Sequence, residues 1–83
     1  MIPPRIEDVK PLDNFCLEIT YVTKEKRIYD MKKILHYDFY RNLNNIGYFK
    51  LVKSALTTVE WPNGEDVDPN ELYGNSVIIN SND

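Results

Sequence analysis

Two residues that could do chemistry occur once each, the thiol of Cys16 and the imidazole of His36. A cysteine nucleophile needs a neighbouring base and a third group that orients the base. Its thiol is inert unless its surroundings lower its pKa. Cys16 falls in a segment with a strand pattern, and His36 ends an expected helix, where a cation favours the helix dipole. We therefore interpret Cys16 as a small buried side chain and His36 as a helix-end cation, and we expect no catalytic residues and no enzymatic activity.

Four acidic residues gather within a short stretch and are the next candidates for chemistry. They are Glu65, Asp66, Asp68 and Glu71. Calcium needs six or more oxygen ligands in a loop of defined spacing, and that spacing is absent. A structural zinc site needs four ligands, more than one cysteine and one histidine supply. Helix capping by Asp68 and Glu71 and turn formation by Glu65 and Asp66 explain the cluster, so we expect no metal and no cofactor.

A basic strip surrounds the expected first hairpin. It consists of Lys24, Lys26, Arg27, Lys32 and Lys33, with Tyr29 among them. Basic residues with an interleaved aromatic ring can bind a single nucleic-acid strand. The chain as a whole carries a formal net charge of −3, whereas nucleic-acid binders usually carry a basic excess. We interpret the strip as a solvated hairpin tip and helix face, which argues against nucleic acid as a partner. A small-ligand or nucleic-acid adaptor using this hairpin is the alternative function.

The aromatic residues give the best candidates for a binding surface. Tyr37 and Tyr40 lie between an expected helix and a loop, with Arg41 beside them. Exposed tyrosines next to an arginine are typical of protein interfaces. Such tyrosines can equally lie flat over a small core with the hydroxyl outward. Trp61, at a strand end before a tight turn, is expected to be a core anchor under the helix that carries Leu72 and Tyr73.

The elements that must position these residues begin with a hairpin. Residues 3–9 form a proline-tagged, extended lead-in. Residues 15–22 alternate between apolar and other side chains, which predicts a half-buried strand. Residues 23–26 form a turn and residues 27–30 a return strand. Asp30 then caps a short helix over residues 31–35, whose apolar stripe is Met31, Ile34 and Leu35.

The second half repeats this order. Residues 39–47 are expected to form a turn or short helix that leads into a strand over residues 48–52, and residues 57–61 form its partner. Proline followed by asparagine and Gly64 predicts a tight turn. Asp68, followed by proline at the first helical position, starts a helix. Residues 77–79 are a candidate edge strand, and residues 80–83 are expected to fray.

The predicted fold class is therefore α+β in the order β-β-α-β-β-α, with two hairpins forming an antiparallel sheet and two short helices covering one of its faces. The expected structural anchors are Asp30, Trp61, Gly64, Asp68 and Tyr73. A chain of 83 residues makes one domain, residues 1–83 with a core over about 6–79. One cysteine makes no internal disulfide, and neither a membrane span nor a signal-peptide core is present. We expect a cytoplasmic protein with no membrane association.

Several segments resemble a known family. The first segment runs from Val9, Lys10 and Pro11 through Ile28, Tyr29 and Asp30, and Leu43 and Phe49 follow. The most specific segment is residues 61–73, in which Trp61, Pro62, Asn63 and Gly64 precede the proline helix start. Together they resemble the domain-of-unknown-function family numbered twenty-four forty-two, over about residues 6–73. The family usually turns its first hairpin with a glycine, and residues 23–26 depart from that.

The resemblance implies a small bacterial protein with a two-hairpin α+β fold and no assigned activity. Members look like one half of a two-gene cassette, paired with another short protein in a toxin–antitoxin-like arrangement. Some carry a C-terminal helix-turn-helix, and residues 1–83 contain none. We therefore expect a protein-interaction module, the antitoxin-like or regulatory partner of a small protein encoded nearby. It would bind through Tyr37, Tyr40 and Arg41, or by adding a strand at residues 77–79 or 27–30. Self-association by the same edge is equally allowed.

Overall fold

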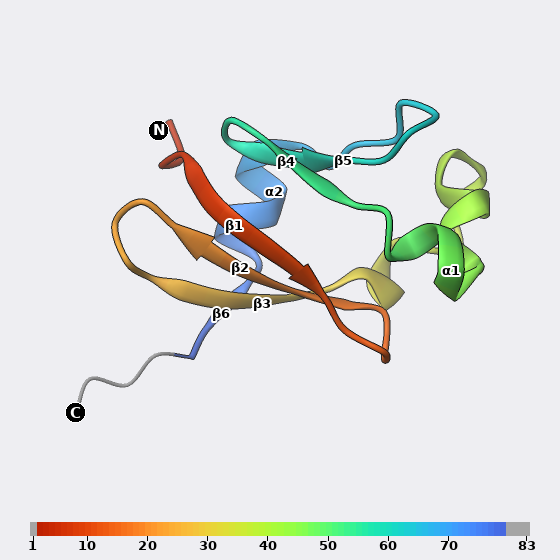
Figure 1. Cartoon of the computed structure of the whole chain (residues 1–83), viewed down its shortest axis with the longest axis horizontal. Helices are drawn as coiled ribbons and strands as arrows, with labels where there is room; N and C mark the ends of the chain where they lie inside the picture. Colours follow the sequence, from red (N-terminus) through yellow and green to blue (C-terminus); the bar gives the residue numbers. More distant parts are fainter. Residues whose placement is uncertain (1, 80–83) are drawn as a thin grey trace.

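The computed structural model describes residues 2–79 (Figure 1). The fold is α+β, as predicted: a four-stranded antiparallel sheet, a two-stranded sheet and a few short helices. The elements in chain order are β1 (Ile6–Pro11), β2 (Cys16–Tyr21), β3 (Lys26–Asp30), η1 (Met31–Lys33), η2 (Asp38–Asn44), α1 (Ile46–Phe49), β4 (Lys53–Ala55), β5 (Thr58–Glu60), α2 (Pro69–Gly74) and β6 (Val77–Ile78).

The first hairpin forms as predicted, but the sheet around it is larger. Its strand order is β1-β2-β3-β6, every neighbouring pair being antiparallel. The lead-in, which was expected to be extended, belongs to a strand that the sequence did not predict: β1 pairs with β2 from Ile6 to Pro11, with a register shift between Ile6 and Asp8. Half of the residues of β1 are exposed, and the register shift between Ile6 and Asp8 interrupts the alternation that marks a strand. The candidate edge strand is real, since β6 pairs with β3.

The second hairpin lies later in the chain than predicted. Residues 48–52 were expected to form a strand, but Tyr48 and Phe49 belong to α1. The physical reason is Asn45, whose side-chain oxygen accepts hydrogen bonds from the backbone N–H groups of Gly47 and Tyr48 and so starts a helix there. The hairpin that follows is β4 and β5, with Ala55 opposite Thr58. It forms a separate small sheet and does not extend the first one.

The first predicted helix is shorter than expected, although its cap is correct. Asp30 accepts a hydrogen bond from the backbone N–H of Lys32, at 2.9 Å. Only one 3-10 turn follows, because Ile34 leaves the helical region with φ −122°. Figure 1 shows that η1, η2 and α1 gather at one end of the sheet. Two helices were expected to cover one face of the sheet, but only α2 does so. It packs against the hydrophobic core through Leu72.

The tight turn and the final helix start where the sequence places them. Gly64 has φ +99°, and its N–H donates to the carbonyl of Trp61 at 2.9 Å. Asp68 accepts from the backbone N–H of Glu71 at 3.1 Å, with proline at the start of α2. The side chain of Glu71 does not cap in return. Its carboxylate accepts from Tyr29 on β3 at 2.8 Å and from Asn75 at 2.7 Å.

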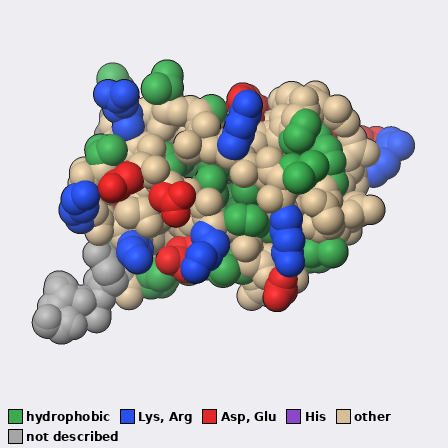
Figure 2. All heavy atoms as spheres, in the orientation of Figure 1, with side chains coloured by type: hydrophobic (Ala, Val, Ile, Leu, Met, Phe, Trp, Pro, Cys, Tyr) green, Lys and Arg blue, Asp and Glu red, His purple; other side chains and the backbone are tan. Residues whose placement is uncertain are grey.

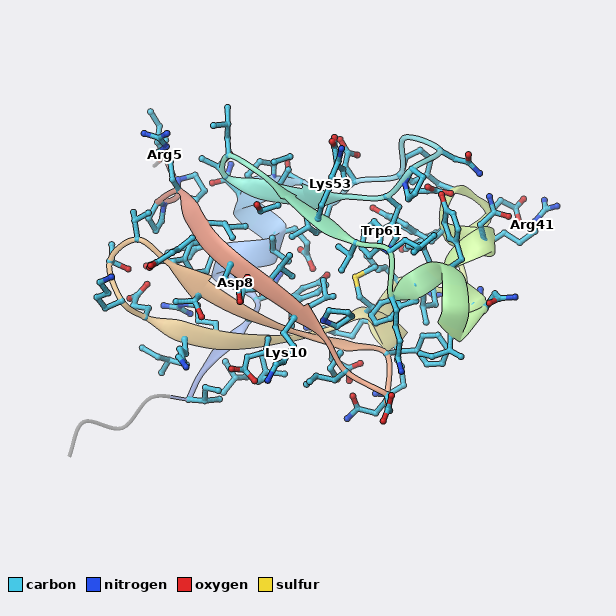
Figure 3. The ribbon with its side chains drawn as sticks, viewed as in Figure 1. Arg5, Asp8, Lys10, Arg41, Lys53 and Trp61 are labelled. Carbon is cyan, nitrogen blue, oxygen red and sulfur yellow. The ribbon has the colours of Figure 1, made fainter. Side chains whose placement is uncertain are left out.

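One hydrophobic core joins the two sheets. Leu17, Ile19 and Tyr21 on β2 are fully buried, as their alternation predicts. Trp61 lies between the strands and α1 in Figure 3 and is 2% exposed. Its indole N–H donates to the carbonyl of Phe49 at 2.8 Å. Trp61 is thus a core anchor as expected, and this bond ties it to α1.

Candidate interaction surface

The segment that carries Tyr37 and Arg41 forms one tip of the molecule. Tyr37 precedes η2 and is 55% exposed, and Phe39 within η2 is 57% exposed. The Tyr37 ring packs against the ring of His36, with centroids 4.1 Å apart. Arg41 projects from the far end in Figure 3 and lies 4.0 Å from Asp38, both side chains being mostly in water. Two exposed aromatic rings and a solvated guanidinium therefore share this tip, which we call the aromatic tip (Tyr37, Phe39 and Arg41).

Tyr40 differs from the sequence-based expectation. It was expected to be an exposed aromatic, but its side chain is half-buried against the core. Its hydroxyl donates to the backbone carbonyl of Asp66 at 2.8 Å. The Phe39 ring meets the Tyr40 ring edge-on, with centroids 4.9 Å apart. Tyr40 therefore anchors the tip to the loop before α2, and Phe39, which the sequence did not single out, is the second exposed ring.

A hollow opens beside the tip, between η2, α1 and the turn after Trp61. It is a shallow depression that is largely open to solvent, with a volume of about 430 Å³. We call it the asparagine hollow, because three asparagines line it. Its lining residues are Asn42, Asn45, Gly47, Tyr48, Leu51 and Asn63. Sequence reasoning missed this hollow, since its walls come from three separate segments that only the fold brings together.

Behind the hollow lies a carboxylate that the sequence suggested was a solvated turn residue. Glu65 is only 5% exposed. It accepts hydrogen bonds from the Tyr48 hydroxyl at 2.7 Å and the Asn42 amide nitrogen at 3.2 Å. Burial alone would raise the pKa of the Glu65 carboxyl, but the hydrogen bonds from Tyr48, the backbone and Asn42 outweigh burial and lower that pKa. Glu65 is therefore an ionised side chain held by neutral donors.

Two other acidic residues of the cluster, Asp68 and Glu71, also have structural roles. Asp68 caps α2, and Glu71 bonds to Tyr29 and Asn75. Within residues 2–79 no three histidine, cysteine, aspartate or glutamate side chains are grouped so that they could hold a metal ion. Cys16 is buried next to the Lys32 ammonium, with 3.8 Å between nitrogen and sulfur, and burial raises the pKa of its thiol. A raised pKa disfavours the nucleophilic thiolate.

The basic strip is partly folded into the protein. Tyr29 is fully buried, so its ring face is not available to stack on a base. The Arg27 guanidinium donates to the backbone carbonyls of Tyr73 and Ser76 and lies 4.3 Å from the centroid of the Tyr73 ring. On the face shown in Figure 2, blue basic and red acidic side chains are interspersed over the strands. The strip is therefore not a uniform cationic surface.

Tyr73, named from the sequence as a structural anchor, ties α2 to the first hairpin. Its hydroxyl donates to Glu25 at 2.9 Å, and its ring meets that of Tyr21 edge-on, with centroids 5.0 Å apart. Close by, β6 ends the sheet with three exposed apolar residues: Val77, Ile78 and Ile79. The N–H of Ile79 donates to the carbonyl of Lys26 on β3, so the backbone groups of Ile78 point away from β3. This edge could accept another strand.

Comparison with known proteins gives one family. A model described as "Protein of unknown function (DUF2442)" matches residues 6–77. No match is found among curated proteins or solved structures. Within residues 2–79 the structure has no helix that is both long and apolar enough to span a membrane.

Proposed function

Because this chain belongs to the DUF2442 family, whose function is unknown, we propose its role from its own surface: it is a non-enzymatic protein-interaction module. Its partner is a small protein encoded nearby in a bacterial two-gene cassette, and the complex acts in the cytoplasm as an antitoxin-like or regulatory pair. The observation that carries this proposal is the aromatic tip, where Tyr37 and Phe39 are more than half exposed beside Arg41. Aromatic residues and arginine are enriched at interfaces and among their hot spots.

The way the tip is anchored also favours binding. Tyr40 is fixed by its hydrogen bond to Asp66, and Leu43 of the same 3-10 segment is fully buried. These two contacts hold the backbone while the neighbouring rings remain in water. A surface whose rings are already positioned loses less conformational entropy on binding.

The adaptor alternative has less support. It requires an accessible cationic strip with a stacking ring, whereas Tyr29 is buried and Arg27 is engaged by backbone carbonyls and Tyr73. The net charge of −3 acts against binding a polyanion. We therefore do not advance it as a second function.

Co-expression of the full chain with the protein encoded by the adjacent gene tests the proposal. We expect a complex at micromolar concentrations that Tyr37→Ala combined with Phe39→Ala weakens at least about tenfold, because truncating central aromatic residues costs about 2 kcal/mol or more. Ile78→Pro serves as the matched variant at the sheet edge. It removes an N–H that points away from β3, so the bonds between β3 and β6 remain.

The two variants separate the routes. Loss of binding in the double variant with normal binding of Ile78→Pro supports the aromatic tip. The reverse pattern would move the interface to the β6 edge, and self-association lost only in Ile78→Pro would mean a second copy of the chain binds there. If co-expression gives no complex at micromolar concentrations, the proposed partnership is wrong.

A further inference from the structure

The asparagine hollow contains hydrogen-bonding groups whose orientation the protein fixes. An asparagine amide offers an oxygen acceptor and a nitrogen donor, and either can face a ligand. At Asn42 the choice is settled by Glu65. An ionised carboxylate only accepts, so Asn42 must direct its nitrogen inward, which is the arrangement observed at 3.2 Å. The side-chain oxygen of Asn42 is therefore the atom left for the hollow.

At Asn45 the choice is settled in the opposite sense. Its side-chain oxygen accepts from the backbone N–H groups of Gly47 and Tyr48, at 2.9 and 3.2 Å. A backbone N–H only donates, so the oxygen must face the helix. The Asn45 nitrogen, with its two hydrogens, is left for the hollow. Asn42 thus contributes an acceptor and Asn45 a donor, each with its orientation settled, and both residues line the same hollow.

The other lining residues are Gly47, Tyr48, Leu51 and the third asparagine, Asn63. The Tyr48 hydroxyl is occupied, since it donates to Glu65 and accepts from the backbone N–H of Asn63 at 2.8 Å. Tyr48 therefore presents only its ring. Leu51 adds an exposed aliphatic side chain. At Gly47 an added Cβ would lie 3.2 Å from the Asn45 side-chain oxygen, so a larger residue would crowd the group that orients Asn45.

We propose that the asparagine hollow binds one residue of an extended peptide, with an aliphatic side chain, whose backbone N–H donates to Asn42 and whose backbone carbonyl accepts from Asn45. The aliphatic side chain packs on Leu51 and the Tyr48 ring. The backbone N–H and carbonyl of one extended residue point to the same side, and they form a neutral donor–acceptor pair that matches Asn42 and Asn45. This inference rests on the proposed function and adds to it, since it names an extended segment of the partner next to the aromatic tip.

The charges around the hollow favour a peptide over a nucleotide. The six lining residues include no lysine or arginine, and two of them, Asn42 and Tyr48, donate to the buried Glu65 carboxylate. A phosphate group needs cationic or backbone N–H donors, and here it would face a carboxylate. A nucleobase could present a similar donor–acceptor edge, so the test includes one.

Titration of the isotope-labelled full chain with N-acetyl-leucine-N-methylamide, followed by NMR, tests the site without any partner. We expect saturable shifts of the side-chain amide signals of Asn42 and Asn45. Asn45→Asp keeps the oxygen that caps α1 and replaces the donor with an acceptor, and should weaken binding at least about tenfold. Asn70→Asp adds the same charge on α2, which Figure 1 shows well away from α1, and should leave binding unchanged.

A second variant tests the apolar part of the site. Leu51→Ser should weaken the leucine probe several-fold and leave N-acetyl-glycine-N-methylamide unaffected, because only the former has a side chain to pack on Leu51. Equal losses for both probes, no loss in Asn45→Asp, or tighter binding of adenosine than of the leucine probe would each overturn the assignment. If the leucine probe does not bind but the complex forms and depends on the aromatic tip, only the proposal that the hollow binds a peptide is wrong. If the probe binds saturably but no complex forms, only the proposed partnership is wrong.

Discussion

Glu65 shows how a single side chain acquires a role that its neighbours in sequence do not indicate. It sits in a turn, between Gly64 and Asp66, where a carboxylate is normally solvated. In the fold it is covered and holds Tyr48 and Asn42, which lie 17 and 23 positions away. Through these two residues it joins α1 and η2 to the turn. A buried carboxylate without a cationic partner is stable only when such donors satisfy it.

Glu65→Gln should therefore destabilise the protein in a pH-dependent way. The pKa of Glu65 lies below its usual value of 4.5 in the folded chain, so its ionisation stabilises the fold above that pH, and this contribution disappears as pH falls through the lowered pKa. We expect a loss of about 1–2 kcal/mol at pH 7. The difference from the parent chain should narrow as pH falls below 4.5 and close once the pH lies below the lowered pKa of Glu65. Denaturant unfolding at several pH values measures both.

Glu60→Gln is the matched control for this experiment. Glu60 is a nearby acid whose side chain pairs with Lys53 at 3.7 Å and is 42% exposed. Its replacement should cost less than about 0.5 kcal/mol at any pH. A Glu65→Gln protein whose stability followed that of Glu60→Gln would show that the buried hydrogen bonds contribute little.

At this scale, the sequence identified residues whose roles are local. Asp30 and Asp68 cap elements that begin beside them, and Gly64 occupies a backbone conformation that its own turn demands. Tyr40 and Glu65 could not be assigned in the same way, because their partners come from distant parts of the chain. Whether an aromatic ring is exposed depends on tertiary contacts. The sequence therefore did not indicate that Phe39 would be exposed and Tyr40 half-buried.

Among the elements, one turn geometry recurs three times. Each is a three-residue loop closed by two backbone hydrogen bonds, and its third residue has a left-handed conformation. Those residues are Phe15 (φ +62°), Lys24 (φ +77°) and Gly64 (φ +99°). Only the last carries the glycine that signals such a turn, so Lys24 stands where a glycine would be relaxed. Sequence patterns predicted the two strands on either side of Lys24, but they did not predict the left-handed conformation of Lys24 itself.

The turn between β4 and β5 contains a fourth left-handed residue, Leu56, with φ +61°. Its side chain is 69% exposed and its carbonyl accepts from the N–H of Ile6 on β1. Leu56→Gly keeps that carbonyl and removes the strained side chain, so it should stabilise the fold by about 0.5–1 kcal/mol. Thermal unfolding should show a melting temperature several degrees higher. Leu56→Asn should give a smaller gain, because asparagine tolerates this conformation.

Thr57→Gly, one position later, is the control for Leu56→Gly. Its φ is not positive, so glycine there relieves nothing and adds freedom to the unfolded chain. Its melting temperature should fall. If both glycine variants melted below the parent chain, the left-handed strain at Leu56 would be disproved.

Across the whole molecule, the two sheets share one hydrophobic core. Leu17 and Ile19 from the larger sheet and Val59 from the smaller one belong to the same buried cluster as Trp61. The backbone bond from Ile6 to Leu56 also joins β1 to the β4–β5 turn, at 2.7 Å. A two-stranded hairpin alone is marginally stable in water. The smaller sheet should therefore persist only while the larger one is folded.

This arrangement predicts a single cooperative unfolding transition. Trp61 is the one tryptophan in the chain, and it lies at the end of the smaller sheet. Its fluorescence should change over the same denaturant range as the far-ultraviolet circular dichroism of the whole chain. Ile19→Ala, in the larger sheet, should cost about 2–5 kcal/mol and shift both signals equally. The smaller sheet would fold separately if the fluorescence changed at a lower denaturant concentration than the circular dichroism, or if Ile19→Ala left the fluorescence transition unshifted. Trp61 would then report only on its own hairpin.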